Sequence, residues 1–338
     1  MSHFATKEDF LAALSALPDA DGEAAARAAA RQAELTKPAG SLGRLEEIAL
    51  FMAGWSGQAC PSLTFVQGIV FAGNHGVAAK GVSAYPAEVT AQMVGNFRQG
   101  GAAINALARA CGAQLTIVPL DLHRPTQDIS EAPAMSGQEC LAALNAGAAA
   151  VDPRADLLFV GEMGIANTTP AAALCAQGFG GTGQEWGGRG TGIDRPAIAR
   201  KIAVVDAALA LHGADCRDPF EVLRRLGGRE IAAMAGAMLA SRHLRIPVLL
   251  DGFIASAALT PMAVAVPGIT AHCLAAHCSA ETGHARLLAH LGLDPLLHLG
   301  MRLGEGSGAA VAVQLVRSAL AAHGEMATFA QAAVAGAL

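Results

Sequence analysis

Two patterns of apolar and polar positions divide the chain. Residues 7–35 and 41–55 carry apolar side chains at helical spacing, which predicts helices separated by the turn KPAGS, with Ser41 as the N-cap of the second segment. From Cys60 onward, short apolar runs end in glycine or an acid and are followed by helical patterns. These runs predict strands at LTFVQGIVFAG, AQLTIVPLDL, DLLFVGEMG and RIPVLLDG, with a weaker signal at AAHCSAE.

Strands that alternate with helices imply an α/β fold with a parallel sheet and right-handed crossovers. The pattern becomes helical again over residues 305–322. We therefore expect a large α/β domain over residues 61–304 and a small helical domain built from residues 1–60 and 305–338. The apolar stretch IPVLLDGFIASAALTPMAVAVPGIT is interrupted by Asp251, Pro261 and Pro267, so it predicts a buried strand, a turn and a buried helix instead of a membrane span.

Composition narrows the class of protein. The 338 residues have a formal net charge of -5 and their basic residues are scattered, so we expect no binding to nucleic acid. The seven cysteines are an odd number and widely spaced, which favours reduced thiols in a cytoplasmic protein. The N-terminal stretch MSHFATKEDFLAALSALPDADGE carries acids and no long apolar run, unlike a signal peptide.

Ligands of parallel α/β sheets bind beyond the carboxyl ends of the strands, and GNHG, GEMG and DGF fall there. In GEMGIANTTPAAA, Asn167 and Thr168 precede a predicted helix and offer polar groups to an anion. Capping alone explains these residues but not Glu162, which stands isolated between Gly161 and Met163. We therefore interpret this stretch as a ligand site.

Two further stretches are candidates with ordinary alternatives. GGRGTGID is a glycine-dense loop that could hold a phosphate through backbone amides, although it is neither a Walker A sequence nor a GxGxxG fingerprint. Lys201 follows it and reads by default as a solvated helix lysine. In FAGNHGVAAKGVSAYPAEVTAQM, Ser83, Tyr85 and Gln92 could wall a pocket for a flat ring, or could simply pack before the next helix, and His75 could be a base or a satisfied loop histidine.

For other acids and histidines, a functional role must likewise be compared with an ordinary structural one. Asp251 ends an apolar strand and is either a helix cap or a ligand-binding carboxylate. His277, Glu281 and His284 have the spacing of one helix face and could bind zinc, but Gly283 and the strand-like HCS favour core histidines. The chain has no G-x-S-x-G elbow, no P-loop and no acidic pair of the kind that holds magnesium on phosphoribosyl pyrophosphate.

Glu305 is the most unusual of the acids. It stands between Gly304 and Gly306 in LGMRLGEGSGAA, just before an alanine-rich run. A solvated surface charge does not require small neighbours on both sides. Glycines beside an acid that faces a ligand let the ligand and the backbone come close.

Together, these pieces resemble one family, the nicotinate-nucleotide–dimethylbenzimidazole phosphoribosyltransferases. The ordered set that carries the resemblance is KPAGSLGRLE, FAGNHGVAAKGVSAYPAEVTAQMVGNF with GGAAIN, GEMGIANTT, GRGTGID with ARK, DGFIASAA, HCSAETGH and LGMRLGEGSGAA. It covers nearly the whole chain. The resemblance implies transfer of a 5-phosphoribosyl group from nicotinate mononucleotide to 5,6-dimethylbenzimidazole, giving α-ribazole 5′-phosphate and nicotinate during cobalamin nucleotide-loop assembly.

The resemblance also implies a Rossmann-like sheet, a small domain made from both chain ends, a homodimer, small-molecule substrates, and no cofactor or metal. It gives Glu305 the role of general base and places Glu162 and Lys201 near the nicotinate and ribose. The ribose and phosphate would be held by Gly161, Gly164, Asn167, Thr168, Gly190 and Thr191. The benzimidazole pocket would be lined by Ser83, Tyr85, Gln92, Met93 and Leu303, with Asp251 near the site in an open role.

Three alternatives remain at this level. A related transferase or phosphorylase could use another acceptor base, because an apolar pocket discriminates weakly between similar rings. A non-catalytic protein could bind α-ribotides or nicotinate nucleotide, although binding alone needs no base at Glu305. The third alternative is the zinc protein.

Overall fold

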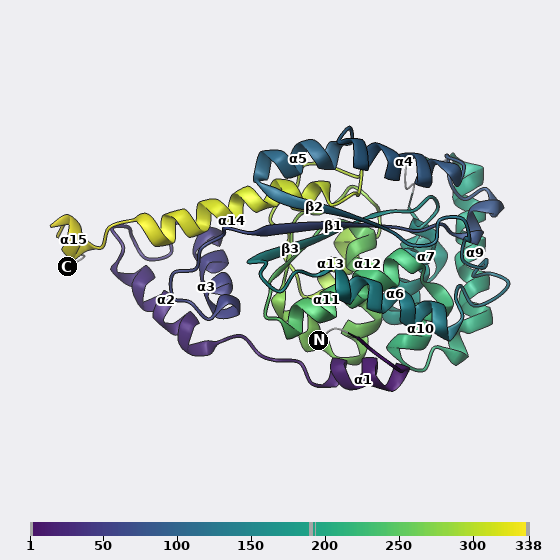
Figure 1. Cartoon of the computed structure of the whole chain (residues 1–338), viewed down its shortest axis with the longest axis horizontal. Coiled ribbons are helices and arrows are strands. Elements are labelled where there is room, and N and C mark those ends of the chain that lie inside the picture. The colour runs from purple at the N-terminus through teal and green to yellow at the C-terminus, as the bar shows by residue number, and fades with distance from the viewer. Residues whose placement is uncertain (1–2, 189–191, 193, 336–338) are drawn as a thin grey trace.

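A five-stranded parallel sheet runs through the middle of the molecule (Figure 1). The computed structural model describes residues 3–188, 192 and 194–335. The strands are β1 Val66–Ala72, β2 Ala113–Pro119, β3 Leu157–Met163, β4 Val248–Leu250 and β5 Cys273–Ala275, in the order β2-β1-β3-β4-β5. Every neighbouring pair is parallel, which confirms the predicted α/β class.

Four strands lie inside the predicted apolar runs, whereas β5 does not. It shares only Ala275 with the predicted AAHCSAE segment. The HCS residues do pair, but with another partner: His277 forms an isolated parallel bridge to Leu297, and the Cys278 N–H donates to the Leu297 carbonyl at 2.9 Å. The predicted strand at AAHCSAE therefore has the wrong bounds: β5 ends at Ala275, and the HCS residues make only an isolated bridge.

Helices cover both faces of the sheet, and each face has its own apolar core. Alternate residues of one strand serve the two cores: Ile69 and Phe71 of β1 face one, and Val66 and Val70 face the other. On the first side lie α6 Gly137–Ala150, α7 Thr168–Phe179, α10 Pro219–Leu226, α11 Arg229–His243, α12 Phe253–Ala265 and α13 His284–Leu291, with α8 Gly183–Trp186 and α9 Arg195–His212 outside α7. On the second side lie α3 Arg44–Ser56, α4 Glu88–Gln99, α5 Ala103–Cys111 and α14 Ser307–Glu325.

Helix α11 is buried along nearly its whole length, which requires close contact with α6. A Cβ atom added to Gly147 of α6 would lie 1.8 Å from the Ala233 carbonyl oxygen, and one added to Gly236 of α11 would lie 2.0 Å from the Leu144 carbonyl oxygen. The two backbones therefore approach each other through glycine on both sides. This packing fixes where α11 begins, beside the carboxyl ends of β1 and β3.

The C-terminal end of the chain lies on the left of Figure 1, where α2 Gly22–Glu34 and α3 lie against the far half of α14, before α15 Phe329–Ala332; the N-terminus lies elsewhere, beside α1. The Arg31 guanidinium of α2 donates to the carbonyls of His323, Gly324 and Met326. The near half of α14 packs on β3 and β4. The division into a small helical domain and a large α/β domain stays a prediction.

The predicted helical segment 7–35 consists of two helices, because Pro18 and two aspartates interrupt it. The first, α1 Lys7–Ser15, packs on α10 rather than on α2 and α3. The prediction of Ser41 as an N-cap is wrong: α3 begins at Arg44, its N-cap is Gly43 with a φ of 52°, and no side chain caps it. Ser41 instead lies in a turn, where its N–H donates to the Pro38 carbonyl at 3.1 Å.

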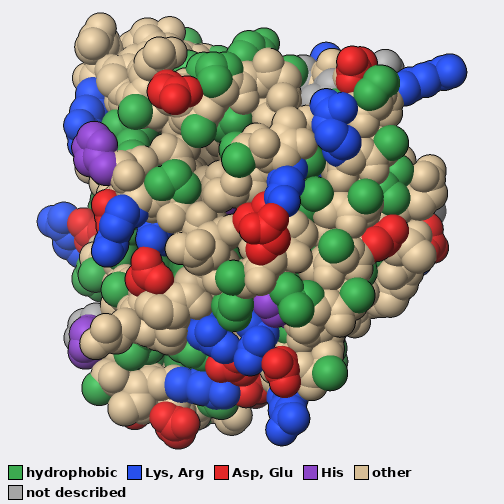
Figure 2. Space-filling model, turned by 90° about the vertical axis from the view of Figure 1, so that its right-hand side faces the viewer, with side chains coloured by type: hydrophobic (Ala, Val, Ile, Leu, Met, Phe, Trp, Pro, Cys, Tyr) green, Lys and Arg blue, Asp and Glu red, His purple; other side chains and the backbone are tan. Residues whose placement is uncertain are grey.

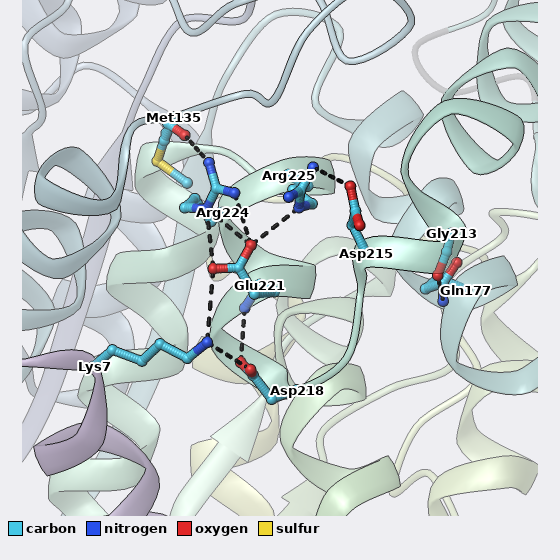
Figure 3. A network of polar contacts seen from close by, with 9 residues as sticks. All are labelled: Lys7, Met135, Gln177, Gly213, Asp215, Asp218, Glu221, Arg224 and Arg225. Atoms are coloured by element: carbon cyan, nitrogen blue, oxygen red, sulfur yellow. Dashed lines mark hydrogen bonds and ion pairs between the residues drawn. The ribbon is translucent and has the colours of Figure 1, made fainter.

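A network of charged side chains ties α1 to α10 (Figure 3). Lys7 Nζ lies 2.6 Å from Asp218 Oδ2 and 3.7 Å from Glu221 Oε1, and Glu221 also pairs with Arg224 and Arg225. Beneath it, the ring of Phe10 contacts Phe220 with centroids 6.3 Å apart. The rings are buried and the Lys7 and Asp218 side chains are 29% and 24% exposed, so we assign most of the docking energy to the rings.

We expect Lys7→Ala to lower the free energy of unfolding by no more than about 1 kcal/mol, because partly exposed ion pairs contribute little in water. Urea unfolding of the wild type and the variant at low and high salt measures this. A loss well above that value, or one that high salt does not reduce, would contradict the assignment.

The surface and the helices add two observations on environment. Figure 2 shows the face at the right of Figure 1, where acidic and basic side chains are interspersed and neither sign forms a continuous field. None of the helices in the described part of the chain is both long and apolar enough to cross a membrane. The stretch from Ile246 to Thr270 forms β4, a turn and the buried helix α12, as predicted.

Candidate active site

The candidate site lies at the point in the sheet where successive strands are added on opposite sides of β1. From β1 the chain moves to β2 on one side, and β3 then pairs on the other side of β1. Crossovers that leave in opposite directions open a crevice at the carboxyl ends of the two strands. The turns after β1 and β3 meet there, because the Gly73 N–H donates to the Met163 carbonyl at 3.0 Å.

Glu162 is the second-last residue of β3 and is buried at this crevice. The Asn167 side-chain amide donates to its Oε2 atom. Burial raises the pKa of Glu162 to about 8, against the opposing effect of the Asn167 hydrogen bond; the neighbouring acids Glu230, Asp251 and Glu305 raise it further. At neutral pH this carboxyl is therefore mostly protonated.

The loop that carries Glu305 lies directly on β3. A Cβ atom added to Gly161 would lie 2.3 Å from the Glu305 carbonyl carbon and 2.4 Å from the Gly306 nitrogen. A Cβ atom added to Gly304 would lie 2.2 Å from Glu162 Oε1. Glycine at 161 and 304 is therefore what allows the two acidic segments to touch.

Glu305 itself has a left-handed backbone. Its φ is 64°, and those of Gly304 and Gly306 are 83° and 84°. Such a conformation costs a residue with a side chain roughly 1 kcal/mol or more, and strain of this kind is concentrated at functional sites. The flanking glycines adopt it freely, so they share the turn that presents the Glu305 carboxyl.

The environment of the Glu305 carboxyl favours its protonated form. Burial raises its pKa, and the backbone N–H of Ile104 in the first turn of α5 acts in the opposite direction. Its Oε2 atom is buried and has no hydrogen-bond partner among the described residues. A raised pKa brings a carboxylate closer to neutral pH, where a general base is most effective.

Asp251 is a helix cap, but of α14 and not of the helix that follows it. Helix α12, which follows it, has Gly252 as its N-cap and no side-chain cap. Asp251 instead caps α14: Oδ1 accepts from the Ala309 N–H at 3.0 Å and Oδ2 from the Gly306 N–H at 3.2 Å. Burial raises its pKa to about 7 in spite of these hydrogen bonds. Asp251 therefore anchors the loop of Glu305, in addition to bordering the cavity.

Lys201 is not a solvated helix lysine. It lies on α9, is 1% exposed, and donates from Nζ to Thr168 Oγ1 at 2.8 Å and to the Gly188 carbonyl at 3.0 Å. Burial lowers its pKa to about 8, and Glu281 acts in the opposite direction. The lysine thus stands behind Thr168, the first residue of α7, and orients its hydroxyl.

Two adjoining cavities open at this edge of the sheet. The first is lined by Glu162, Met163, Gly164, Ile165, Asn167, Thr168, Asp251, Gly252, Phe253, Ile254, Ala255, His277, Ser279, Glu281, Arg302, Leu303 and Gly304. The second, of about 590 Å³, is lined by Tyr85, Val89, Met93, Met163, Arg302, Leu303 and Glu305. Met163, Arg302 and Leu303 border both, so polar groups on one side face a mainly apolar space on the other.

Most of the predicted site residues come together here, and some do not. Those that line a cavity are Tyr85, Met93, Glu162, Gly164, Asn167, Thr168, Asp251, Leu303 and Glu305. Gly161 lies beneath the Glu305 loop, and Lys201 lies behind Thr168. Ser83 and Gln92 border neither cavity; the Ser83 hydroxyl accepts from the Tyr85 N–H at 3.3 Å. Gly190 and Thr191 lie outside the described residues.

The histidines of the zinc alternative lie in different environments: His284 packs inside the fold, and His277 borders the first cavity. His277 follows β5 and His284 begins α13, so they do not share a helix face. The two nitrogens of His284 contact Ser256 Oγ at 3.1 Å and the Ser279 N–H at 2.9 Å. Within the described residues, no group of three acidic, histidine or cysteine side chains could hold a metal ion.

Two residues that border both cavities, Met163 and Arg302, were not predicted from the sequence. Arg302 is the only arginine or lysine among the described residues that line them. Arg302 stands three positions before Glu305 in the same LGMRLGEGSG stretch. This proximity in sequence could have identified it as a site residue. Met163 follows Glu162 directly, lines the first cavity with it and extends to the second.

The raised pKa of Glu162 predicts how stability depends on pH. Between the ordinary carboxyl pKa near 4.5 and the folded value of about 8, the unfolded chain has lost this proton and the folded chain keeps it. The free energy of unfolding should therefore fall as pH rises through this range. We expect Glu162→Gln to make that fall smaller. Denaturant unfolding of both proteins at pH 5 and pH 8 measures the difference, and an equal fall in both would contradict it.

Comparisons with known proteins identify the family of this chain. A family model described as a phosphoribosyltransferase matches residues 17–334. The chain is 65% identical, over the whole length of both, to the nicotinate-nucleotide–dimethylbenzimidazole phosphoribosyltransferase of Novosphingobium aromaticivorans. It is 59% identical to the one from Ruegeria pomeroyi, over 95% of each chain. The crystal structure of CobT from Thermus thermophilus superposes with a TM-score of 0.87 at 40% identity, covering 93% of this chain and 100% of that one. The chain therefore belongs to the nicotinate-nucleotide–dimethylbenzimidazole phosphoribosyltransferase family.

Proposed function

We propose that this protein transfers the 5-phosphoribosyl group of nicotinate mononucleotide to 5,6-dimethylbenzimidazole, with Glu305 as the general base. The observation that carries the proposal is the place of Glu305. It is a buried carboxyl with an unpartnered oxygen, and it borders an open, largely apolar cavity that adjoins one lined in part by the polar side chains of Asn167 and Thr168. A flat apolar base fits the open cavity, and a phosphorylated sugar needs polar groups such as those that line the first cavity.

The chemistry needs one group to accept a proton. A ring nitrogen of the benzimidazole attacks the anomeric carbon, the bond from that carbon to the pyridinium nitrogen breaks, and nicotinate leaves with the electron pair. The attacking ring carries one N–H, which must be lost as the new bond forms. The Glu305 carboxylate accepts that proton. Attack from the face opposite nicotinate gives the α configuration of α-ribazole 5′-phosphate.

The other residues bind and orient the donor. Arg302 borders both cavities, and a guanidinium suits the carboxylate or phosphate of nicotinate mononucleotide. Asn167 and Thr168 begin α7, where backbone amides and hydroxyls favour an anion. Lys201 supports Thr168 from behind. Gly190 and Thr191 retain the proposed role of phosphate contacts, and Ser83 and Gln92 that of outer residues of the base pocket.

We also propose a cytoplasmic homodimer. The support for the dimer is the family resemblance together with large apolar side chains left exposed. Tyr85 and Leu303, which line the open cavity, are 53% and 54% exposed, and Leu299, four positions before Leu303, is 58% exposed. All seven cysteines are free thiols in the structure, as reducing conditions would keep them. Light scattering during gel filtration should give twice the 34.1 kDa chain mass; the monomer mass would contradict the dimer.

A mass-spectrometric assay tests the reaction. Purified protein is incubated with nicotinate mononucleotide and dimethylbenzimidazole, and α-ribazole phosphate and nicotinate should appear in equal amounts. A panel of purines and phenols in place of dimethylbenzimidazole tests the alternative of another acceptor. Nucleotide binding without either product from any acceptor would favour the non-catalytic binder and overturn the proposal.

A further inference from the structure

A buried acid and a buried histidine form a pair directly beneath the site. His75 follows β1 and precedes the short helix η1 Gly76–Lys80, and Glu230 is the second residue of α11. His75 Nε2 lies 2.6 Å from Glu230 Oε1, and the two residues are 2% and 0% exposed. Neither residue borders the cavities described above.

The pair fills the space between the turns that follow β1 and β3. A Cβ atom added to Gly73 would lie 2.5 Å from Glu230 Oε2, and one added to Gly164 would lie 2.9 Å from Glu230 Oε1. On the far side, a Cβ atom on Gly228 would lie 2.2 Å from His75 Cε1. The Glu230 carboxyl is therefore in van der Waals contact with both turns at once.

The pair is costly as a purely structural device. His75 Nδ1 and Glu230 Oε2 are buried without a hydrogen-bond partner among the described residues. Unpaired buried polar atoms cost free energy, so this pair contributes less stability than apolar residues of similar size would. Incomplete polar networks of this kind are expected where function requires them.

Both halves of the site depend on the two turns. The turn after β3 includes Gly164 and leads to Asn167, the partner of Glu162. The turn after β1 leads through η1 to Tyr85 in the wall of the open cavity. Helix α11 is a rigid support for Glu230, because Arg229 pairs with Glu139 at 2.5 Å and the helix packs tightly on α6.

We propose that Glu230, oriented by His75, is a positioning residue for the transfer reaction, which holds the turns after β1 and β3 together beside the Asn167 amide that donates to Glu162. The inference rests on the proposed reaction and on the place of Glu162 in its site. Its chemistry is electrostatic and steric, with no contact to substrate.

The charge of Glu230 acts on Glu162 within a cluster of acids. Glu162 faces Glu230 at the start of α11, Asp251 after β4 and Glu305 before α14, and Glu230 in turn faces His75. After burial, Glu230 is the largest influence that raises the pKa of Glu162. Removing the negative charge of Glu230 should therefore lower that pKa.

Two variants separate charge from position. Glu230→Gln keeps the length of the side chain and an oxygen acceptor for His75 but removes the charge. Glu230→Asp keeps the charge but is one methylene shorter, so it cannot touch His75 and both turns together. Each variant is made in the wild type and in Glu162→Gln, and kcat/KM is measured against pH from about 5.5 to 9.5, the range around the shifted carboxyl.

One limb of the pH profile of kcat/KM should report the titration of Glu162 and should therefore be missing in Glu162→Gln. We expect Glu230→Gln to move that limb toward lower pH by about half a unit or more, the size of a single charge removed nearby. In the Glu162→Gln background it should move nothing. Glu230→Asp should lower kcat/KM by roughly tenfold, through misplacement of the turns, and leave the limb where it is. Equal losses in both variants with an unmoved limb would show a merely structural role and overturn the inference.

A second readout does not depend on turnover. The fall in unfolding free energy between pH 5 and pH 8 should be smaller in Glu230→Gln than in the wild type and unchanged in Glu230→Asp. If the wild type made no α-ribazole phosphate, the proposed reaction would fail, while this readout would still decide the pair. If Glu230→Gln did not fold, Glu230→Asp alone would decide. The inference would then be overturned if the limb in the kcat/KM pH profile of Glu230→Asp moved, or if its kcat/KM equalled that of the wild type.

Discussion

Glu305→Gln is expected to lower turnover by about a hundredfold or more, the usual scale for loss of a general base, while the fold is retained. Glutamine has nearly the same shape, so the left-handed turn and the contact with β3 remain, but its amide cannot accept the benzimidazole proton at neutral pH. Steady-state kinetics with the mass-spectrometric assay measures kcat, and a thermal unfolding curve shows whether the variant is folded.

The matched control is Glu325→Gln, the same change on the exposed last residue of α14. It should leave both kcat and stability within error of the wild type. Near-normal turnover in Glu305→Gln would remove Glu305 from the role of base. A loss of only a few fold would mean that orientation of the two substrates, rather than proton transfer, supplies most of the rate.

Gly161→Ala is expected to be nearly as damaging, although alanine adds a single methyl group. That methyl would lie 2.3 Å from the Glu305 carbonyl carbon, and backbone cannot move aside as a flexible side chain can. The Glu305 loop must shift by the order of 1 Å, which can cost roughly a hundredfold in rate, and overpacking should lower the free energy of unfolding by about 1–3 kcal/mol.

The control for this change is Gly22→Ala, because a Cβ atom added to Gly22, at the start of α2, would meet nothing within 4 Å. Activity and stability should stay close to those of the wild type. Kinetics and urea unfolding of the three proteins measure both effects. Gly161→Ala with wild-type turnover would show that the loop does not need its contact with β3.

Most of the sheet could be predicted from sequence because β1, β3 and β4 are buried on both faces and are bounded by glycine or acid. These three strands are short apolar runs that end in a polar residue or glycine, and a run of that kind is compatible with few structures other than a buried strand. β5 has three residues and a weak signal, so its position was missed. Ser41 failed as a cap because the chain satisfies the backbone there through turns instead of a side chain.

Site residues on strand ends and glycine turns were predictable, because parallel topology brings those ends together. Burial of isolated residues was not. Lys201 lies on a helix of mixed polarity, and only the packing of α7 against α9 shows that its ammonium is enclosed. The role of Asp251 depends on a contact with residues 55 and 58 positions away. His75 and Glu230 are 155 positions apart, and no local pattern links them.

Helix α14 has a consequence for how this protein can vary. Its first turn holds the loop of Glu305 and its last turns hold α2 and α3, so one rigid rod of 19 residues sets the distance and the rotation between them. Adding one residue to an α-helix advances everything beyond it by about 1.5 Å and turns it by about 100°. The length of α14 should therefore tolerate change as poorly as the identity of residue 305, even where the individual side chains along the helix are replaceable.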